Sequence, residues 1–398
     1  MVNKLLSGFG GLCNSHAMYS KLAAHAFVLV AVFALSTQSS HANQAFVHPG
    51  GVNGKVELEQ VRQRIQRDAS LWSSTGKYAP LRALATPYTK TQAPCNAHRC
   101  EGEAKDDAKK AYANALAWYY TGDAQYADNA MRVFRIWAAD FEGYKVVAGV
   151  SGQSQLNAGW IGALFGSAAE VLRSYAGWSE KDKVAVKALF AAGFYPALHQ
   201  ESEWNGNNDL TQIDALMNIA VFSENEAWLN EAKDRLRRRN PRFFFLPSDA
   251  GIDYGSTNPS WYNPTRWVAG VTQETCRTNA KLPNDNGHHT QYALASALRA
   301  AEVAWNQGDK SLYAENQTRY TAAMELLALQ VTSGNMQGVC ADPKTTASLF
   351  DTWVIGYNHY HRRVGLVLPN TQKLLENGTA RNFRSDWNIF YESLTHGE

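Results

Sequence analysis

The feature that most constrains the fold is a series of amphipathic helical segments that come in pairs. After Asn43, apolar residues recur at helical spacing, and the pairs follow one another about 40 residues apart. Strand-like alternation is almost absent before the tail, which counts against a doubly wound sheet. Repeated hairpins predict a solenoid or a ring, and the many small residues among the aromatic ones in Trp160–Ala169 favour a closed α/α toroid. The expected helices are Val56–Ile65, Ala111–Tyr120, Tyr126–Phe141, Leu156–Tyr175, Glu180–Leu198, Leu210–Phe222, Glu226–Arg239, His289–Trp305 and Leu312–Val331.

Two long irregular stretches interrupt the helices, at residues 241–283 and 333–350. Loops of this length in a compact domain are often functional. We therefore expect these two stretches to form the walls of a binding cleft.

Residues 1–42 are expected to be a signal peptide. Lys21 precedes the apolar run Ala26–Leu35, and the small residue Ala42 suits cleavage before Asn43. The run of roughly ten apolar residues is too short for a bilayer core, which needs about 20. We therefore expect an exported protein, periplasmic or secreted, that is not held in a membrane.

The charge of the chain argues against a general affinity for polyanions. The formal charge is +2, from 38 Lys and Arg against 36 Asp and Glu. The first 42 residues contain Lys4 and Lys21 and no acid, so 36 basic and 36 acidic side chains balance in the remainder. A neutral protein has no overall field that attracts nucleic acid or an anionic membrane. Recognition of a charged partner must then be local.

Four cysteines follow the predicted signal peptide. An exported protein can form disulfides, and an even number fits two bridges. Cys95 and Cys100 are close enough to close a small loop, which leaves Cys276 to pair with Cys340. The alternative is a zinc site that uses His98, but its spacing matches no standard ligand pattern. We expect the two disulfides and no metal.

The first candidate site is the amide-rich segment 204–209, directly before a predicted helix. Asp209 and Gln212 fit a capping box, which explains the acid but not the neighbouring amides Asn207 and Asn208. Amide donors at the positive end of a helix are suited to holding a carboxylate.

The second candidate is the pair His288 and His289, in the segment 286–291 at the head of another helix. Adjacent histidines point in different directions on a helix, so they do not form the i, i+4 metal pair of a zinc protease. One of them is expected to face the interior. It is either an ordinary buried or capping residue, or a functional group whose charge is easily set near neutral pH.

The third candidate is the segment 353–363, in which two tyrosines, two histidines and two arginines lie within seven residues. An aromatic stripe is usually core, but a core does not need so many donors, each of which requires a partner when buried. We therefore expect a binding role for this cluster. The arginine run in 235–242, at the end of another helix, is expected to be solvated instead.

A set of short motifs extends from His48 to the final third of the chain. They are Phe46–Gly50, Asn114–Asp123, Gln155–Trp160, Asn205–Asn207, His289–Gln291, Ala304–Gly308, Tyr357–His361 and Leu368–Thr371. Together they resemble the alginate lyase superfamily of polysaccharide lyases. The last two motifs are most similar to polysaccharide lyase family 38, whose members act on glucuronan and polymannuronate.

The resemblance implies an α/α toroid as a single domain, residues 43–398, and a β-elimination that needs no metal or cofactor. In such lyases an amide and a histidine neutralise the substrate carboxylate, and a tyrosine handles the protons. The matching residues here are Asn207, His289 and Tyr357. Asn208 stands where relatives commonly have Trp, and residues 278–288 look like an insertion. The alternatives His288 for His289 and Tyr360 for Tyr357 therefore stay open. The expected substrate-binding residues are Tyr360, His359, Asn208, His288, Arg277 and Arg363.

The chemistry of uronic acids agrees with these roles. The proton on C5 is too weakly acidic to remove until the adjacent carboxylate is neutralised and the carbanion can delocalise. In mannuronate and glucuronate this proton and the leaving O4 lie on the same side, so one residue can act first as base and then as acid. A tyrosine suits both steps if a cation such as Arg277 or Arg363 lowers its pKa. The expected partner is an anionic polysaccharide, and the expected product carries a 4,5-unsaturated sugar.

Two other functions remain open at this point. An inverting glycoside hydrolase on a similar toroid would need two carboxylates roughly 6.5–9.5 Å apart. A non-catalytic glycan-binding protein would use tryptophans as stacking platforms. The candidate acids are Asp209, Asp253 and Asp285, and the candidate platforms are Trp204, Trp261 and Trp267.

Overall fold

The computed structural model of the protein describes residues 45–146, 152–202, 206–249, 251, 264–276, 288–341, 349–377 and 390–397. The predicted signal peptide lies outside these residues. Residues 45–398 form one compact unit, and its described part contains helices and no β-sheet. The predicted all-helical class and the α/α toroid are confirmed.

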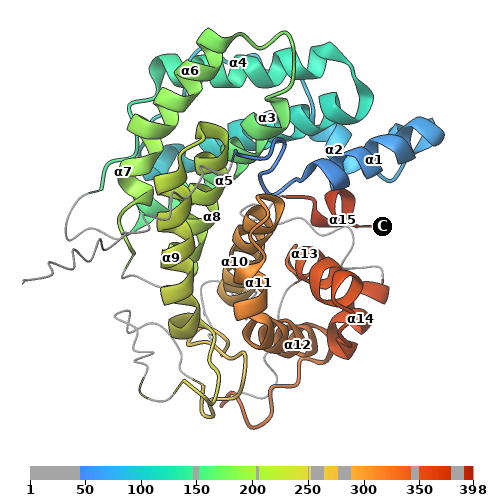
Figure 1. The fold of residues 1–398 in the computed structure, drawn as a ribbon, viewed down its shortest axis with the longest axis vertical. Coiled ribbons are helices and arrows are strands. Elements are labelled where there is room, and N and C mark those ends of the chain that lie inside the picture. Colours follow the sequence, from blue (N-terminus) through green and yellow to red (C-terminus); the bar gives the residue numbers. More distant parts are fainter. Residues whose placement is uncertain are drawn as a thin grey trace, which may run out of the picture. The chain divides into compact units, whose positions relative to one another are not determined.

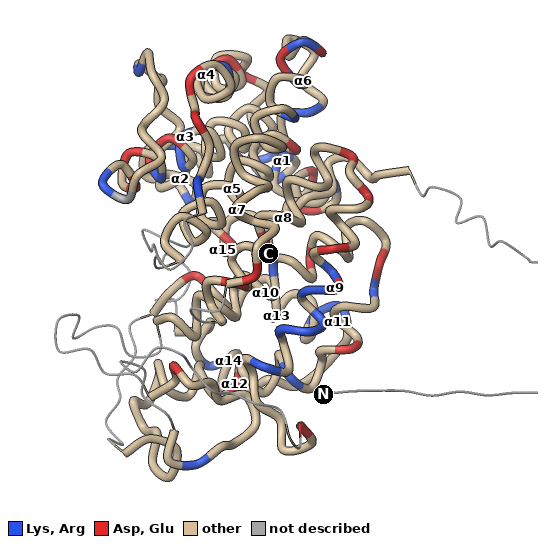
Figure 2. The backbone as a smooth tube through the Cα atoms, turned by 90° about the vertical axis from the view of Figure 1, so that its left-hand side faces the viewer, with Lys and Arg blue, Asp and Glu red and all other residues tan. Residues whose placement is uncertain are grey.

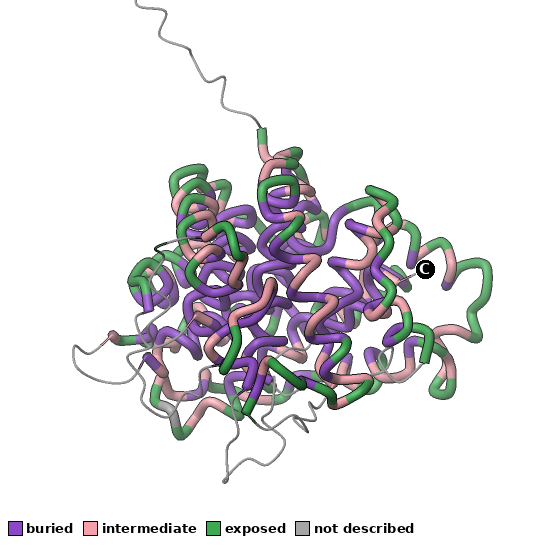
Figure 3. The backbone as a smooth tube through the Cα atoms, turned by 90° about the horizontal axis from the view of Figure 1, so that it is seen from below, coloured by how far each residue is buried: buried purple, intermediate pink, exposed green. Residues whose placement is uncertain are grey.

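Four long helices form the inner layer of the described toroid, and they lie side by side in chain order (Figure 1). They are α3 (Glu101–Thr121), α5 (Gln153–Leu172), α8 (Gly206–Ser223) and α10 (His288–Asn306). Nearly every residue of α5, α8 and α10 is buried, whereas the outer helices expose one face (Figure 3). The outer helices are α4 (Ala124–Asp140), α6 (Glu180–Leu189), α9 (Glu226–Phe243) and α12 (Gln317–Ser333).

Shorter elements complete the described chain. They are α1 (Lys55–Arg67), η1 (Ala69–Trp72), α2 (Ala79–Leu84), η2 (His98–Cys100), η3 (Phe190–Phe194), α7 (Tyr195–Leu198), α11 (Ser311–Glu315), α13 (Val354–Tyr357), η4 (Asn358–Arg363), α14 (Pro369–Glu376) and α15 (Glu392–Thr395).

Contacts between α8 and α10 show that these helices run in parallel. Thr211 Oγ1 lies 3.3 Å from Ser296 Oγ, and Arg299 Nε donates to Asp214 Oδ2 at 2.7 Å. Both pairs are 85 residues apart, so one constant register relates the two helices. The N-terminal ends of the inner helices consequently lie at one edge, which we call the N-terminal rim.

Glycines allow α5 and α8 to approach closely. A Cβ on Gly159 would lie 2.7 Å from Thr211, and one on Gly166 would lie 2.8 Å from Asn218. Real Cβ atoms do not approach other atoms so closely, because packed interiors leave no such room. The small residues of α5 thus allow the close helix packing that the sequence predicted.

The opposite ends of the inner helices are joined by the N-terminal segment 45–54. His48 Nδ1 lies 2.6 Å from Glu170 Oε1 at the end of α5, and Val52 N donates to Asn218 Oδ1 at 3.0 Å. Near the other end of the chain, His396 Nε2 lies 3.0 Å from the carbonyl oxygen of Val52. The first and last described segments therefore pack together away from the rim.

Both predicted disulfides are present. Cys95–Cys100 directly precedes α3, and Cys276–Cys340 joins two loops beside the start of α10. The second bridge packs with Met336 in a small apolar cluster. Each disulfide thus braces chain next to the N-terminal rim. None of the helices within the described ranges is both long and apolar enough to cross a bilayer.

Candidate functional site

Asn207 lies in the first turn of α8, at the N-terminal rim. The residue is 2% exposed, and its Oδ1 atom is buried without a hydrogen-bond partner in the described structure. Its backbone is held in place, because Thr211 Oγ1 donates to the Asn207 carbonyl oxygen at 2.8 Å. A buried amide oxygen without a partner costs about 1–3 kcal/mol, and such groups are rare unless a ligand or water completes them. Asn207 is therefore a strong candidate for a ligand contact.

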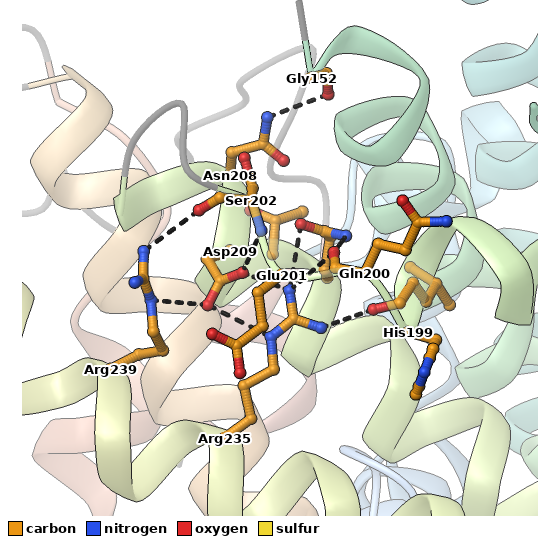
Figure 4. Close-up of polar contacts among 12 residues, drawn as sticks. Gly152, His199, Gln200, Glu201, Ser202, Asn208, Asp209, Arg235 and Arg239 are labelled. Atoms are coloured by element: carbon orange, nitrogen blue, oxygen red, sulfur yellow. Dashed lines mark hydrogen bonds and ion pairs between the residues drawn. The ribbon is translucent and has the colours of Figure 1, made fainter. Parts of the chain in front are cut away.

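The neighbouring amide, Asn208, has a structural contact. Its Nδ2 donates to the carbonyl oxygen of Gly152 at 3.0 Å, which ties the start of α8 to the start of α5 (Figure 4). Asn208 thus holds two helix ends together at the rim, and its substrate-binding role stays a prediction.

Asp209 holds the first turn of α8 in place by binding two arginines of α9 (Figure 4). The carboxylate is fully buried; it pairs with Arg235, and its Oδ2 lies 2.7 Å from Arg239 Nε. Asp209 Oδ1 also accepts from Ser202 N at 2.8 Å. A carboxylate engaged in this way is not available as a hydrolase acid or base. The expectation that the whole arginine run is solvated is wrong for Arg235, which is 1% exposed because it is paired.

Adjacent arginines of α9 allow a test of this clamp. Lys and Arg gather along α9 with Asp and Glu between them (Figure 2). We expect Arg239→Met to lower the free energy of unfolding by about 1.5–3 kcal/mol, because it removes a charge-assisted bond to a buried carboxylate. Arg238→Met is the matched control: Arg238 pairs with Glu201 on the surface, where an ion pair contributes about 0–1 kcal/mol. Urea unfolding of both variants gives the comparison, and equal losses would contradict the clamp.

A small cluster with two aromatic rings, which we call the aromatic floor, is separate from the main core. It consists of Leu156 and Trp160 of α5 and Tyr292 of α10, with ring centroids of Trp160 and Tyr292 6.1 Å apart. The constant register between α8 and α10 places Tyr292 opposite Asn207, one turn closer to the rim than the Thr211–Ser296 pair. The amide and the phenol therefore lie at the same level of two neighbouring helices.

The environment of Tyr292 keeps its phenol protonated. Burial raises the pKa of Tyr292 well above its usual value, and Arg299 and the Thr211 hydroxyl oppose the shift only in part. A buried phenol of this kind is a proton donor at neutral pH rather than a base.

The two histidines begin α10 at the same rim. His288 is 8% exposed and stacks on Phe350 at 4.0 Å between ring centroids, whereas His289 is more exposed. They lie four and three residues before Tyr292, so each is a neighbour of Tyr292 on the helix surface, one on either side of it. Thr272 Oγ1 lies 2.9 Å from Thr290 Oγ1, which fixes this turn against the loop that carries Cys276.

Tyr357 does not join this site. α13 follows α10 away from the rim: Phe350 N donates to Gln291 Oε1 at 2.9 Å, whereas a Cβ on Gly356 would lie 2.9 Å from Leu298. Leu298 is six residues, or about 9 Å of helix, further from the rim than Tyr292. Tyr357 itself stacks on His361 at 4.5 Å. The structure therefore does not bring Tyr357 to Asn207 and the histidines.

The other predicted binding residues of this third cluster are part of the core. Tyr360 is fully buried and its hydroxyl donates to the Tyr313 carbonyl oxygen at 3.0 Å. His359 stacks on the Tyr313 ring at 3.7 Å. Arg363 lies 2.7 Å from Glu302 and 2.8 Å from Glu57. Tyr360 and Arg363 thus bond protein groups near the end of α10, whereas His359 Nδ1 has no partner among the described residues. Substrate binding by these three residues stays a prediction.

His359 has a consequence for stability in acid. Burial lowers its pKa from 6.5 to about 4, and Arg363 adds to the shift. Between pH 6.5 and pH 4 His359 is therefore protonated in the unfolded chain and neutral in the folded chain. The free energy of unfolding falls over this range as the pH drops, by roughly 1.4 kcal/mol per pH unit at most.

We expect His359→Phe to keep the stacking on Tyr313 and to lose this component of the acid sensitivity. Urea unfolding of the protein and the variant at pH 7 and pH 4.5 measures it. An unchanged difference between the two pH values would show that another group is responsible.

The remaining candidates divide into two groups. Trp267 is described, and its ring centroid lies 5.5 Å from that of Phe245. Arg277, Asp253, Asp285, Trp204 and Trp261 lie outside the described residues. Within the described ranges, no three His, Cys, Asp or Glu side chains come together in a way that could hold a metal ion.

Trp160 and Tyr292 were not predicted from the sequence as parts of the site. Trp160 closes the motif Gln155–Trp160, and Tyr292 follows the histidine pair by one helical turn. The spacing of three and four residues could have indicated Tyr292, because such residues share a helix face. Nothing in the local pattern distinguished it from an ordinary core tyrosine.

Comparison with known proteins agrees with this architecture. The family model described as alginate lyase matches residues 56–242. Alginate lyase A1-III from Sphingomonas species A1 is similar with a TM-score of 0.56 and 16% identity, covering 82% of this chain and 92% of that chain. A variant of A1-III complexed with a tetrasaccharide has a TM-score of 0.55, 16% identity and the same coverage.

A third similar structure is an alginate lyase from Bacteroides ovatus. Its TM-score is 0.51 at 12% identity, with 88% of this chain and 95% of that chain covered. At such identities, the three structures establish a shared fold. No curated protein sequence matches the chain. This chain is thus similar to alginate lyases over residues 56–242, and it shares the helical toroid of the solved structures.

Proposed function

We propose that this protein is a polysaccharide lyase that cleaves β-1,4-linked uronic acid polymers, polymannuronate or glucuronan, by syn β-elimination. The observation that carries the proposal is the buried side chain of Asn207, which makes no hydrogen bond with any described residue, so that its NH2 group is available to a carboxylate at a rim where helices begin near a phenol and two imidazoles. Support also comes from the alginate lyase family match over residues 56–242. The assignment to polysaccharide lyase family 38 rests on the motifs Tyr357–His361 and Leu368–Thr371 alone.

The rim suits the carboxylate of a uronic acid. Asn207 offers amide hydrogens, and the positive ends of α5, α8 and α10 face the same edge. Helix N-termini and fixed donors stabilise the negative charge that develops when the C5 proton leaves, because they need no reorganisation during the reaction. The substrate carboxylate can then carry the charge as an enolate-like dianion.

The proton transfers follow from the two kinds of group at the rim. We assign removal of the C5 proton to His288 or His289, because a neutral imidazole accepts a proton near neutral pH. Tyr292, protonated by its environment, gives its proton to the leaving O4. The C5–H and C4–O4 bonds break, and a C4=C5 double bond forms at the new non-reducing end.

The test is to mix the purified protein with polymannuronate, polyguluronate and glucuronan and to follow the ultraviolet absorbance of the conjugated double bond. We expect absorbance to rise with polymannuronate or glucuronan, and much less with polyguluronate, whose geometry requires opposite-face chemistry. Release of saturated sugars would indicate a hydrolase, and binding without any product would indicate a glycan-binding protein. We further propose export to the periplasm or the medium, on the predicted signal peptide at residues 1–42.

A further inference from the structure

Lys105 is a buried cation on the inner helix α3. The residue is 8% exposed, and its Nζ lies 2.7 Å from Glu101 Oε1, one helical turn nearer the rim. Its buried neighbours Ala104, Ala108 and Ala111 are small and apolar. A buried ion pair generally contributes no more stability than well-packed apolar residues would. The ion pair with Glu101 alone therefore does not explain a lysine at this position.

The pair lies next to the floor of the proposed site. Lys105 Nζ is 4.9 Å from the ring centroid of Trp160, and Trp160 packs against Tyr292. The negative charge of Glu101 contributes to raising the pKa of Tyr292, so Glu101 also lies within electrostatic reach of the phenol. Lys105 is thus close to the reacting groups without being one of them.

Polar groups along the rim connect the start of α8, where Asn207 lies, with the start of α3, where Lys105 lies. Asn208 of α8 is bonded to Gly152, and Gln153 of α5 donates to Glu101 Oε2 at 3.1 Å. This strip follows the ends of three neighbouring inner helices, α8, α5 and α3. A chain of acidic sugars laid along it would place one carboxylate at Asn207 and another towards Lys105.

We propose that Lys105 binds the carboxylate of a sugar adjacent to the one held at Asn207, so that the protein recognises consecutive acidic sugars. The inference rests on the proposed function and extends it to a second subsite. An ammonium group has three donors, so it can bond a substrate carboxylate while Glu101 keeps it in position. Lys105 is a substrate-binding residue in this scheme and takes no part in proton transfer.

The test compares Lys105→Met with the matched control Lys109→Met. Lys109 lies one turn further along α3, is buried to a similar degree and pairs with Asp106 in its own helix. We expect Lys105→Met to raise the Kd for a saturated oligouronate, measured by calorimetry, by about 10- to 100-fold, as for the loss of a charge-assisted bond. KM should rise in parallel while kcat changes less than about threefold, because the lost contact acts on binding alone. Lys109→Met should bind like the unmodified protein, and Lys105→Arg should restore most of the affinity.

Carboxyl-reduced oligosaccharide of the same length gives the second comparison. The unmodified protein and Lys105→Met should bind this neutral ligand equally. If Lys105→Met melts at a lower temperature than Lys109→Met, its weaker binding does not separate a lost contact from lost stability. Glu101→Gln, which keeps the shape of the side chain, is then the variant that tests the subsite. The amide oxygen of that variant can still accept from Lys105, and the competing negative charge is gone, so it should bind oligouronate several-fold more tightly.

The outcomes separate this inference from the proposed function. An unmodified protein that binds oligouronate but forms no unsaturated product, with binding lost in Lys105→Met, would refute the lyase and support the subsite. An active lyase whose Kd and KM are the same in Lys105→Met as in Lys109→Met would overturn the subsite. Tightened binding of the neutral ligand in Glu101→Gln would overturn it as well.

Discussion

Asn207→Ala is expected to reduce kcat on the uronic acid polymer by about 10²–10³-fold while leaving the protein folded. Removal of one preorganised donor to a developing negative charge has an effect of this size. The fold should tolerate the change, because the Asn207 side chain makes no hydrogen bond with any described residue. Initial rates from ultraviolet absorbance and thermal melting of the same preparation measure the two properties.

Asn218→Ala is the control for this prediction. Asn218 is also a buried amide of α8, but it accepts from Val52 N and Ser167 Oγ and donates to Asp214. Its loss leaves buried partners unsatisfied, at about 1–3 kcal/mol each, so we expect a lower melting temperature. The two variants should therefore show opposite patterns of lost activity and lost stability. An active Asn207→Ala would remove the amide from the mechanism.

Tyr292→Phe is expected to lower kcat by about 10²–10⁴-fold, the range for loss of a positioned general acid. Phenylalanine keeps the packing against Trp160, so the melting temperature should change little. Tyr357→Phe is the comparison, and we expect it to retain most of the activity because Tyr357 lies along α10 beyond the rim. Steady-state rates with one polymer decide between them.

The reverse result would reassign the phenol. If Tyr357→Phe were inactive and Tyr292→Phe active, Tyr357 would be the phenol that handles the protons and Tyr292 would have no part in the reaction. Loss of activity in both variants with intact folding would assign two phenols to the reaction. Single substitutions of His288 and His289 to Gln, assayed in the same way, identify which imidazole takes the proton.

The structure also changes the case for a hydrolase. Asp209 was a plausible acid from its sequence neighbours, yet it is fully buried and bound by Arg235 and Arg239. Its function in the fold is to hold the chain on either side of Asn207: Ser202 before it, and the first turn of α8 after it. A carboxylate held by two guanidinium groups has its lone pairs in use and does not exchange protons with a substrate. The proposed lyase site depends on Asp209 for its position only.

The amino-acid sequence by itself determined the helices, their pairing and the two disulfides. Apolar spacing reports which face of each helix is buried, and a helix start is a local matter, so Asn207 at the head of α8 was predictable from neighbouring residues. Which of Tyr292 and Tyr357 lies level with Asn207 was not predictable in this way. Both are aromatic residues on helices, and each follows or precedes a histidine by a turn or less.

Only the tertiary structure decided which phenol meets the amide. That choice depends on the register between α8 and α10, which is set by contacts such as Asp214–Arg299 between residues 85 positions apart. The same holds for Arg235, which appeared as one of several solvated cations until Asp209 was seen beside it. Periodicity within one helix does not show how far a neighbouring helix is shifted along its axis. Side chains brought together by packing are therefore identified only when the helices are assembled.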